Sequence, residues 1–453
     1  MQLPPSPQSP AFVQLMRWIF SPMSFMSECT RRYGDIYSLN LSRKYANVVF
    51  VSNPQALQQI LTQDTRDDFS APGDQNDLFK SLVGSSSLIT LSGSEHQRQR
   101  QLMLPAFHGD RMRTYGRVIE QVTAEAIEQL PIGQTFDVRM MTQMITLQVM
   151  MQAVFGLNIG ERAKQLERLL VTLTDRGGTP FSVIMLYLPM LQRESFGPWA
   201  AQMRLHQEID ALIYAEITER RANPDASGTD ILSMLMIAQD ESGESMTDVE
   251  LRDELMTLLF AGHETTATAL AWALYWIHKL PAVKEKLLAE IDSLGKNPDV
   301  NTILKLPNLD AVCNETLRIY PVAMLTFPRV VNQPVSLGGS ELPAGTLVLG
   351  SIYSTHQRED LYPQPQEFRP ERFLERQFSP FEFLPFGGGT RRCIGSAFAL
   401  FEMKLALVGM LSHRELELAD LREIGAKRRG LVTAPARPIQ MVVKSYRSVP
   451  ALS

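Results

Sequence analysis

The stretch Phe386-Gly-Gly-Gly-Thr-Arg-Arg-Cys393-Ile-Gly395 is the most informative part of the sequence. A lone cysteine is ordinarily a small buried hydrophobic residue. This one follows a glycine cluster and two arginines, and a run of small residues typical of a helix comes after it. Glycines let a backbone approach a flat object closely, because they lack a Cβ atom. Arginines and a helix N-terminus favour the thiolate, so this loop has the chemistry of an axial ligand to haem iron.

The spacing Phe-x-x-Gly-x-Arg-x-Cys-x-Gly resembles the haem-binding signature of the haem-thiolate monooxygenases, the cytochrome P-450 family. Chance would produce such a pattern in fewer than about one chain in ten thousand of this length. The resemblance extends over nearly the whole chain, because further motifs follow in the family's order. It implies that Cys393 binds the iron of haem b, with Phe386 and Gly395 as further cofactor-binding residues.

The composition is that of a globular protein, with 453 residues of which 44% are hydrophobic and 21% charged. Length alone suggests about three domains. No linker, charge block or repeat divides the sequence, so we predict one domain, residues 1–453. The net charge of −5 argues against nucleic acid as a partner. Three cysteines form no disulfide framework, which favours a reducing compartment.

The N-terminal segment shows no predicted membrane span. The apolar stretch 11–20 contains Gln14 and Arg17 and stops at Pro22, so it is too short and too polar to cross a bilayer or act as a signal peptide. Membrane-anchored members of the family carry a spanning helix before a proline-rich hinge, and this chain resembles them from the hinge onward. We expect a soluble, monomeric, cytoplasmic protein. Four residues are candidates for contact with a membrane surface: Phe12, Leu15, Trp18 and Ile19.

Hydrophobic periodicity predicts a mainly α (α+β) fold with a small antiparallel β region. Strands are expected at about 35–60 and 322–353, and a last hairpin is expected from the segments 431–433 and 439–443. The helix from Thr247 to Leu280 begins with a capping box and ends at Pro281. Because 255–276 is apolar on nearly every face, we expect this helix to be central. The resemblance implies the cytochrome P-450 fold, with haem between the central helix and the cysteine loop.

One polar insertion, Ala-Gly-His-Glu-Thr-Thr at 261–266, interrupts the central helix. The simplest interpretation is that Thr265 and Thr266 bond to carbonyls one turn earlier while Glu264 sits in a buried ion pair. A zincin-type metal site is excluded, since residue 267 is alanine where the second histidine would be.

The resemblance adds another interpretation of the same insertion, because it resembles the family's oxygen-activation motif. An acid and a hydroxyl beside a widened helical turn can relay protons to bound dioxygen. On this basis Glu264 and Thr265 are the catalytic residues. Ala261 and Gly262 are small and would leave room for dioxygen over the iron.

The pair Glu315-x-x-Arg318 has i,i+3 spacing, which by itself indicates an ordinary helix pair worth a few tenths of a kcal/mol. It resembles the family's Glu-x-x-Arg motif, and the segment 368–373 supplies the third member, Arg372. The resemblance implies a buried ion-pair cluster under the haem loop. We expect this cluster to be structural.

The haem propionates need cationic partners. His96 and Arg100 lie at i,i+4 in a predicted helix, a spacing that in isolation equally indicates a solvated basic face. The resemblance favours both as propionate ligands, joined by Arg391 and, further along, by Arg329. Many bacterial members carry histidine where others carry tryptophan, and position 96 follows that variant.

The resemblance also outlines a substrate pocket on the distal side of the haem. Its predicted lining is chiefly apolar, which would select an apolar substrate by burial. The lining residues are Leu82, Val83, Phe181, Ala323, Met324, Leu325 and Thr433, with Ala261. The sequence resembles cyanobacterial and other bacterial members that hydroxylate fatty acids or alkanes, and a terpenoid substrate is the alternative.

Electrons are expected from a separate protein, a ferredoxin or flavodoxin with its reductase, because the haem domain takes up the whole length. Arginines 98, 100, 391 and 392 could steer such an acidic partner. A different class of function, a haem-thiolate binding protein without turnover, remains open. The presence of Glu264 and Thr265 argues against it.

Overall fold

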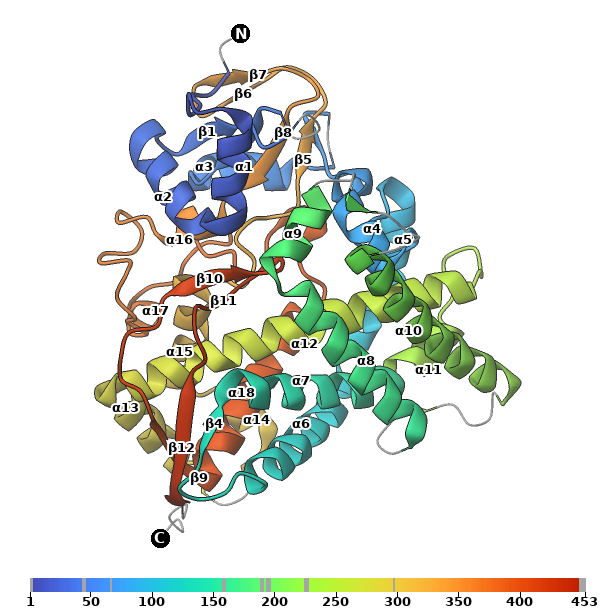
Figure 1. Ribbon diagram of the computed structural model, residues 1–453, viewed down its shortest axis with the longest axis vertical. Helices are drawn as coiled ribbons and strands as arrows, with labels where there is room; N and C mark the ends of the chain where they lie inside the picture. The colour runs from blue at the N-terminus through green and yellow to red at the C-terminus, as the bar shows by residue number, and fades with distance from the viewer. Residues whose placement is uncertain are drawn as a thin grey trace.

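The computed structural model describes residues 3–42, 46–65, 67–156, 160–187, 191–192, 197–223, 228–295 and 298–447. A small β lobe carries the N-terminal helices, and a larger helical body lies below it in Figure 1. The β lobe is flanked by α1 (Ala11–Phe20), α2 (Pro22–Tyr33), α3 (Pro54–Thr62), α4 (Asp77–Val83) and α16 (Ile352–His356). The helical body contains α5 (Gly93–Met103), α6 (Asp110–Glu128), α7 (Val138–Phe155), α8 (Glu161–Gly177), α9 (Pro180–Tyr187), α10 (Gly197–Ala222), α11 (Ile231–Ile237), α12 (Asp248–Lys279), α13 (Pro281–Asp292), α14 (Val300–Ile303), α15 (Pro307–Ile319), α17 (Arg372–Glu375) and α18 (Ser396–His413).

The central helix is α12, which crosses the helical body in Figure 1. Thr247 caps it, and the predicted capping box is present, because the Thr247 hydroxyl accepts from the Glu250 N–H while the Glu250 carboxylate accepts from the Thr247 N–H. The helix stops one residue before Pro281, which starts α13. Most of its side chains are buried, as its apolar composition predicts.

The β region is organised around one five-stranded sheet of order β1-β2-β8-β5-β3. Its strands are β1 (Ile36–Leu39), β2 (Val48–Val51), β8 (Leu347–Gly350), β5 (Arg329–Val331) and β3 (Phe69–Ser70). The predicted first hairpin is present, with Ile36 opposite Val51. One pairing departs from the expected antiparallel arrangement, because β2 runs parallel to β8 with Val49 beside Val348. A parallel pair needs a long crossover, and here most of the chain lies between the two strands.

The predicted last hairpin is wrong. β11 (Val432–Pro435) pairs with β10 (Ala426–Arg429), whereas β12 (Gln440–Tyr446) pairs with β9 (Arg414–Leu418) and β4 (Thr135–Asp137). Thus the two C-terminal strands belong to different sheets. A further small hairpin is formed by β6 (Val335–Leu337) and β7 (Ser340–Leu342).

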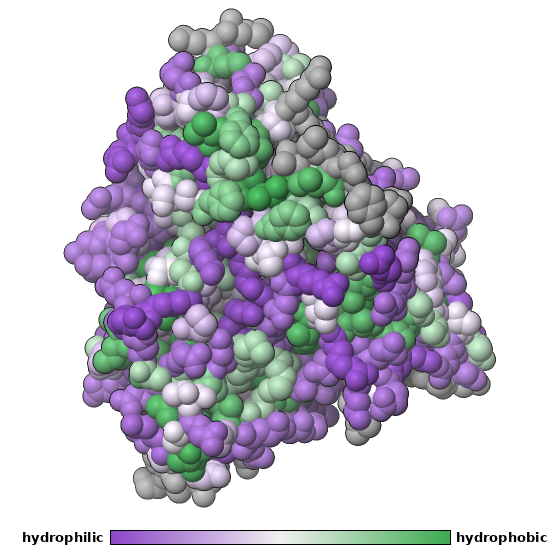
Figure 2. Space-filling view, viewed as in Figure 1, coloured by the Kyte–Doolittle hydropathy of each residue, from purple (hydrophilic) through white to green (hydrophobic). Residues whose placement is uncertain are grey.

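The apolar face of α1 packs inside the protein. Leu15, Trp18 and Ile19 are 5%, 3% and 2% exposed, and the Trp18 ring lies 5.5 Å from that of Phe50. The expectation that these three residues touch a membrane is therefore wrong, since their spacing reflects a face that covers the sheet. Phe12, the fourth candidate, is 69% exposed. Figure 2 shows apolar side chains gathered on this face of the molecule, over α1 and α9.

Among the residues that the structure describes, one helix is long and apolar enough to cross a membrane by composition, namely α18. Most of its side chains are buried in the protein, including Phe398, Phe401 and Leu407. They belong to the same core cluster as the α12 residues Leu270 and Trp272. Its apolar character is thus that of a core helix, which follows directly after the cysteine loop.

Candidate active site

The cysteine loop is held by backbone hydrogen bonds and by a buried aspartate. The Cys393 N–H donates to the Phe386 carbonyl over 3.0 Å, which closes the loop, and Gly395 directly precedes α18. Gly389 has a φ of +64°, and a Cβ atom there would lie 2.2 Å from Oδ2 of Asp64. Only glycine fits this position, because the backbone is left-handed and the carboxylate leaves no room for a side chain.

Asp64 joins the loop to the β lobe. Its Oδ2 accepts hydrogen bonds from the N–H and the hydroxyl of Thr390, both over 3.0 Å. The same oxygen accepts from Nε of Arg329 over 2.8 Å and lies 2.7 Å from Nη2. Arg329 also donates to the Gly388 carbonyl over 2.9 Å. Since Arg329 is 1% exposed, its charge is balanced inside the protein by Asp64.

The thiol of Cys393 lies at the surface of the loop but is closely surrounded by protein. The residue has solvent-accessible surface, yet the surrounding protein atoms desolvate the thiol and raise its pKa. Both observations fit a side chain that faces an interior recess. The Gly395 N–H and the charges of Arg100 and Arg392 act in the opposite direction and lower the pKa. These groups favour a thiolate, the form that binds iron.

Four basic side chains gather beside the loop. Burial, together with the charges of Arg391, Arg100 and Arg329, lowers the pKa of His96 to about 3. Burial, together with the charges of Arg329 and Arg100, lowers the pKa of Arg391 to about 10. Neighbouring cations lower one another's pKa because each lies in the positive potential of the others. The two carboxylates of a haem would neutralise that potential, so the donor set fits the cofactor.

Arg391 meanwhile donates to backbone carbonyls in the segments before and after α4. Its Nη1 donates to the Leu88 carbonyl over 2.8 Å, and its Nη2 donates to the Ala71 carbonyl over 2.6 Å. This side chain therefore positions the segment that precedes His96. Arg100 is half-buried, and no hydrogen bond of its side chain is present within the described residues.

Glu264 of the central helix lies in a charged cluster. Its Oε1 is 3.3 Å from Nη1 of Arg139 in α7 and 3.3 Å from Nε of Arg429 in β10. Arg429 also pairs with Asp175 of α8 over 2.8 Å, and Asp175 is half exposed. The arrangement links four elements through one buried carboxylate, so the simplest interpretation of Glu264 as an ion-paired residue describes its geometry.

The threonines of the insertion bond within the helix. Thr265 donates to the Ala261 carbonyl over 2.6 Å, and Thr266 donates to the Gly262 carbonyl over 3.1 Å. A Cβ atom at Gly262 would lie 2.8 Å from Cε of Met150. The end of the Met150 side chain in α7 therefore packs closely against Gly262. Ala261 is exposed although it stands in a largely buried helix.

His263 links the central helix to α8. Its Nδ1 lies 2.5 Å from the Leu259 carbonyl and its Nε2 lies 3.1 Å from the hydroxyl of Thr174. Within the described part of the chain, no group of three His, Cys, Asp or Glu side chains is placed to hold a metal ion.

The structure brings Glu315, Arg318 and Arg372 together in the interior. Arg318 donates to Glu315 through Nε over 2.7 Å and through Nη2 over 2.9 Å, and Arg372 Nε donates to the same carboxylate over 3.1 Å. The Arg369 N–H donates to Glu315 as well, over 2.8 Å. Arg318 donates on to the His356 carbonyl over 2.8 Å. Every charge is thus paired and hydrogen-bonded, as a buried cluster requires.

The predicted pocket residues occupy several different environments. Leu82 and Val83 of α4 are buried, and Thr433 is fully buried with an unpartnered hydroxyl. Met324 and Leu325 pack in the cluster formed by α1, α2 and the first strands. Two residues are exposed, Phe181 at 48% and Ala323.

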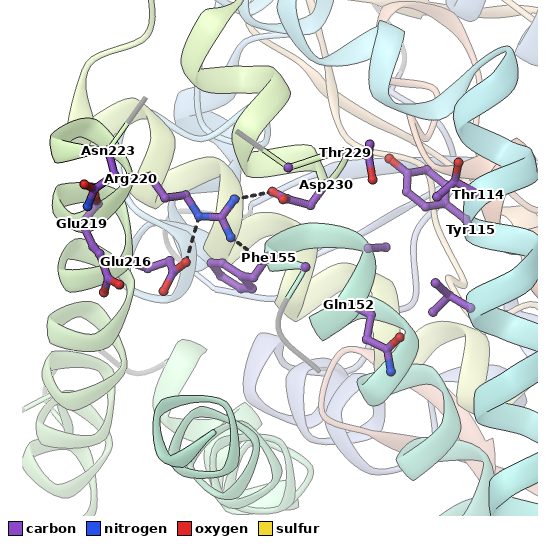
Figure 3. Close-up of a pocket in the computed structure, with 14 residues that line it drawn as sticks. Thr114, Tyr115, Gln152, Phe155, Glu216, Glu219, Arg220, Asn223, Thr229 and Asp230 are labelled. Atoms are coloured by element: carbon purple, nitrogen blue, oxygen red, sulfur yellow. Dashed lines mark hydrogen bonds and ion pairs between the residues drawn. The ribbon is translucent and has the colours of Figure 1, made fainter. Parts of the chain in front are cut away.

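A cavity of ≈ 640 Å³ lies between α6, α7 and α10, at a distance in sequence from all these motifs (Figure 3). At its centre Arg220 pairs with Glu216 over 2.8 Å and with Asp230 over 2.6 Å, and it also donates to the Phe155 carbonyl. Its described lining includes neither the cysteine loop nor the 261–266 insertion. Volume alone therefore does not identify the active site.

Sequence analysis did not identify three residues of the site, Asp64, Arg139 and Arg429. Each pairs with a residue more than 100 positions away along the chain. Only one general signal was available, namely that a buried charge needs a partner. Which residue supplies the partner depends on the fold.

The cysteine loop, the basic cluster beside it and the central helix together define a haem-thiolate protein. The family model "Cytochrome P450" matches residues 4–443, so the chain belongs to the cytochrome P450 family. It is accordingly a monooxygenase, an oxidoreductase whose cofactor is haem.

Two mycobacterial proteins with provisional names are similar over the full length. Cytochrome P450 135B1 of Mycobacterium tuberculosis is 36% identical over 100% of this chain and 94% of its own. Cytochrome P450 138 of the same organism is 32% identical over 96% of this chain and 95% of its own.

Solved structures share the fold. Retinoic-acid-bound cyanobacterial CYP120A1 has a TM-score of 0.86 at 24% identity, covering 98% of this chain and 99% of that one. The heme domain of cytochrome P450DA has a TM-score of 0.85 at 24% identity, covering 99% of this chain and 98% of that one. They confirm the mainly helical cytochrome P-450 fold that the sequence predicts.

Proposed function

We propose that this monooxygenase inserts one oxygen atom of dioxygen into a C–H bond of an apolar molecule, a long-chain fatty acid or an alkane. The proposal rests on the apolar side chains assigned to the distal pocket: Leu82 and Val83 are buried, Ala261 is exposed on the central helix, and none of the three carries a charge. A terpenoid is the second candidate, since the same surfaces would accept it. We further propose a single domain of residues 1–453 and a monomeric, cytoplasmic protein.

We assign the cofactor-binding roles as follows. Cys393 supplies the thiolate, and the Gly395 N–H together with nearby arginines stabilises its charge. We propose that His96, Arg100 and Arg391 face the propionates, with the two arginines as the cations and His96 as a neutral hydrogen-bond donor beside them. Arg329 acts through Asp64, which fixes the loop at Thr390. When bound, the haem supplies the iron at which dioxygen is reduced.

Glu264 and Thr265 are assigned to proton delivery. The half-exposed Asp175 shares Arg429 with Glu264, so a carboxylate that meets solvent and a carboxylate on the central helix are joined by one guanidinium. Rotation of Glu264 away from the two arginines would bring its proton towards the Thr265 hydroxyl. Thr265 bonds to the Ala261 carbonyl, on the turn that bears an exposed alanine. Ala261 is assigned to the oxygen-binding surface.

We propose a separate ferredoxin or flavodoxin with its reductase as electron donor. Of the four arginines that could steer it, Arg98 pairs with Asp240 over 2.5 Å and with Glu250 over 2.8 Å, and Arg391 is buried. Arg392 is exposed beside the cysteine and is the best placed for docking. Reduction by such a donor should slow as ionic strength rises, and a salt-independent rate would contradict this part of the proposal.

The decisive experiment is the carbon-monoxide difference spectrum of the reduced protein. A thiolate-bound haem gives a strongly red-shifted Soret band, and Cys393→Ser should abolish it. A spectrum of histidine-bound haem in the unmodified protein would refute the assignment of Cys393. Substrate-dependent NAD(P)H consumption with a reductase system then separates an enzyme from a haem-binding protein without turnover. Fatty acids, alkanes and terpenoids are compared by the product formed per electron pair consumed.

A further inference from the structure

A groove of ≈ 610 Å³ lies where the N-terminal helices meet β10, apart from the haem loop. One wall comes from the end of α1 and from α2, and the other comes from β10 and from two tyrosines that follow α15 and begin α16. This volume lies within the range of ordinary small-molecule sites. Neither the cysteine loop nor the oxygen-activation residues are among its lining.

The groove carries an excess of positive charge. Arg31, Lys427 and Arg428 line it, and the carboxylate present, Glu28, is already paired with Arg17 over 2.6 Å. Arg31 and Lys427 are exposed and have no ion pair among the described residues. Arg31 thus shares the nearby Glu28 with Arg17, and Lys427 has no paired acid in the part of the chain that the structure describes.

Arg428 is half-buried and is the least exposed of the three cations. Its Nη1 donates to the Trp18 carbonyl over 2.8 Å, and its guanidinium carbon lies 4.6 Å from the centre of the Trp18 ring. Its Nε is buried without a hydrogen-bond partner. A buried donor that is left unpaired is costly. An anionic oxygen in the groove would accept a hydrogen bond from this N–H or would balance the charge of the guanidinium.

The rest of the lining is amphipathic. Phe20 is 58% exposed, and Met23 and Pro22 continue this apolar edge along α2. The phenol ring of Tyr320 packs against Trp272, tilted by 39° with ring centres 4.3 Å apart, and forms an apolar floor. Tyr353 adds a hydroxyl, which lies 3.5 Å from that of Ser27. The groove therefore offers cations at one part and apolar surface at another.

We propose that this groove binds an amphipathic anion, an alkyl chain that ends in a carboxylate or phosphate group, as a second site separate from the haem pocket. The anionic group meets Arg31, Lys427 and Arg428, and the chain lies against Phe20 and the two tyrosines. Such a ligand exists as a free fatty-acid-like molecule or as a lipid in a bilayer. The binding chemistry is the same for both, and the experiment separates them.

The test uses the haem-loaded protein and decanoate below its micelle concentration. Two optical signals report different sites, because the Soret band follows the haem pocket while Trp18 emission follows the groove through Arg428. We expect a saturable change in Trp18 emission, which Trp18→Phe removes. Decanol, which lacks the charge, and inorganic phosphate, which lacks the chain, should each bind at least about tenfold more weakly than decanoate.

Two charge reversals on one helix give the matched comparison. Arg31→Glu should weaken the Trp18 response to decanoate by at least about tenfold, the change expected when one ionic contact is lost and a repulsive one gained. Arg32→Glu is the control. Arg32 is the exposed neighbouring residue and does not line the groove, and its substitution changes the net charge by the same amount. Neither substitution should alter the Soret titration.

The same pair of variants distinguishes the source of the anion. The groove would be assigned to a lipid headgroup if the protein binds vesicles of phosphatidylglycerol but not of phosphatidylcholine, and binds decanoate only weakly. Arg31→Glu should then abolish the vesicle binding. Equal losses in the Arg31 and Arg32 variants would reduce the effect to diffuse charge and overturn the proposal. It is overturned as well if decanoate and both vesicles leave Trp18 emission unchanged while the Soret band responds normally.

Discussion

Replacement of Asp64 by asparagine tests whether the haem loop depends on a buried ion pair outside its own motif. The carboxylate receives two hydrogen bonds from Thr390 and two contacts from Arg329, all between 2.7 and 3.0 Å. Removing one partner of a buried pair costs about 3–5 kcal/mol, because the other charge stays buried without compensation. The asparagine keeps one oxygen for Thr390, so we expect about 3 kcal/mol.

Urea unfolding of the haem-loaded protein, followed by the Soret band and by far-ultraviolet circular dichroism, measures this loss. The Soret transition should move to lower urea than the circular dichroism transition, because the affected contacts are those of the loop. Asp67→Asn is the matched control, since Asp67 is exposed three residues away and the charge change is the same.

A double variant isolates the pair itself. In Asp64→Asn with Arg329→Met the uncompensated guanidinium is gone, and the loss should fall to about 1 kcal/mol or less. If the double variant is less stable than Asp64→Asn by as much as Arg329→Met alone destabilises the protein, the two side chains act independently. That result refutes the reasoning. A loss below about 0.5 kcal/mol in the single variant refutes it too.

Four further outcomes are expected. Thr265→Ala should uncouple electron use from product formation, measured as product per NAD(P)H, and unchanged coupling would remove its relay role. Arg429→Ala takes one of two cations from Glu264 and should lower coupling, while Arg437→Ala, on the same hairpin region but paired with Asp420, should not. Glu315→Gln should cost about 3–5 kcal/mol and haem retention, since two buried arginines lose their carboxylate. Burial holds the pKa of His356 at about 3, below its ordinary value, so the unfolded chain takes up the proton first and stability falls as the pH drops from about 6.5 towards 3. His356→Gln should flatten that slope by up to about 1.4 kcal/mol per pH unit, measured by urea unfolding at several pH values.

The sequence predicted those features that short-range chemistry controls. The capping box of α12, its end before Pro281 and its burial all follow from neighbouring residues, and the structure contains each of them. The β1–β2 hairpin was predictable for the same reason. The last hairpin failed because strand propensity does not specify a partner, and β12 finds β9 and β4 across the fold. The face of α1 was misjudged because an apolar stripe looks the same whether protein or lipid covers it.

The site residues form the same two groups, those that lie in short sequence motifs and those that only the fold brings together. The cysteine and the Glu-x-x-Arg pair lie in short motifs with fixed spacing, so one sequence is enough to find them. Asp64 lies in a polar segment with no distinguishing pattern, and its partners Arg329 and Thr390 are 265 and 326 residues away. A single sequence contains no information on such a pairing, because it results from how β3, β5 and the cysteine loop are brought together.

Glu264 shows how the structure changes the question that the sequence posed. The simplest interpretation, an ion-paired acid with threonines bonded one turn back, matches the contacts of Glu264, Thr265 and Thr266. Those contacts do not oppose a proton relay, because an acid that must be ionised between proton transfers needs cations to hold it while buried. Arg139 and Arg429 meet that need, and the half-exposed Asp175 links them to solvent. In the proposed relay the ion pair would be the resting position of Glu264, and the Arg429 and Thr265 variants measure whether the acid leaves it.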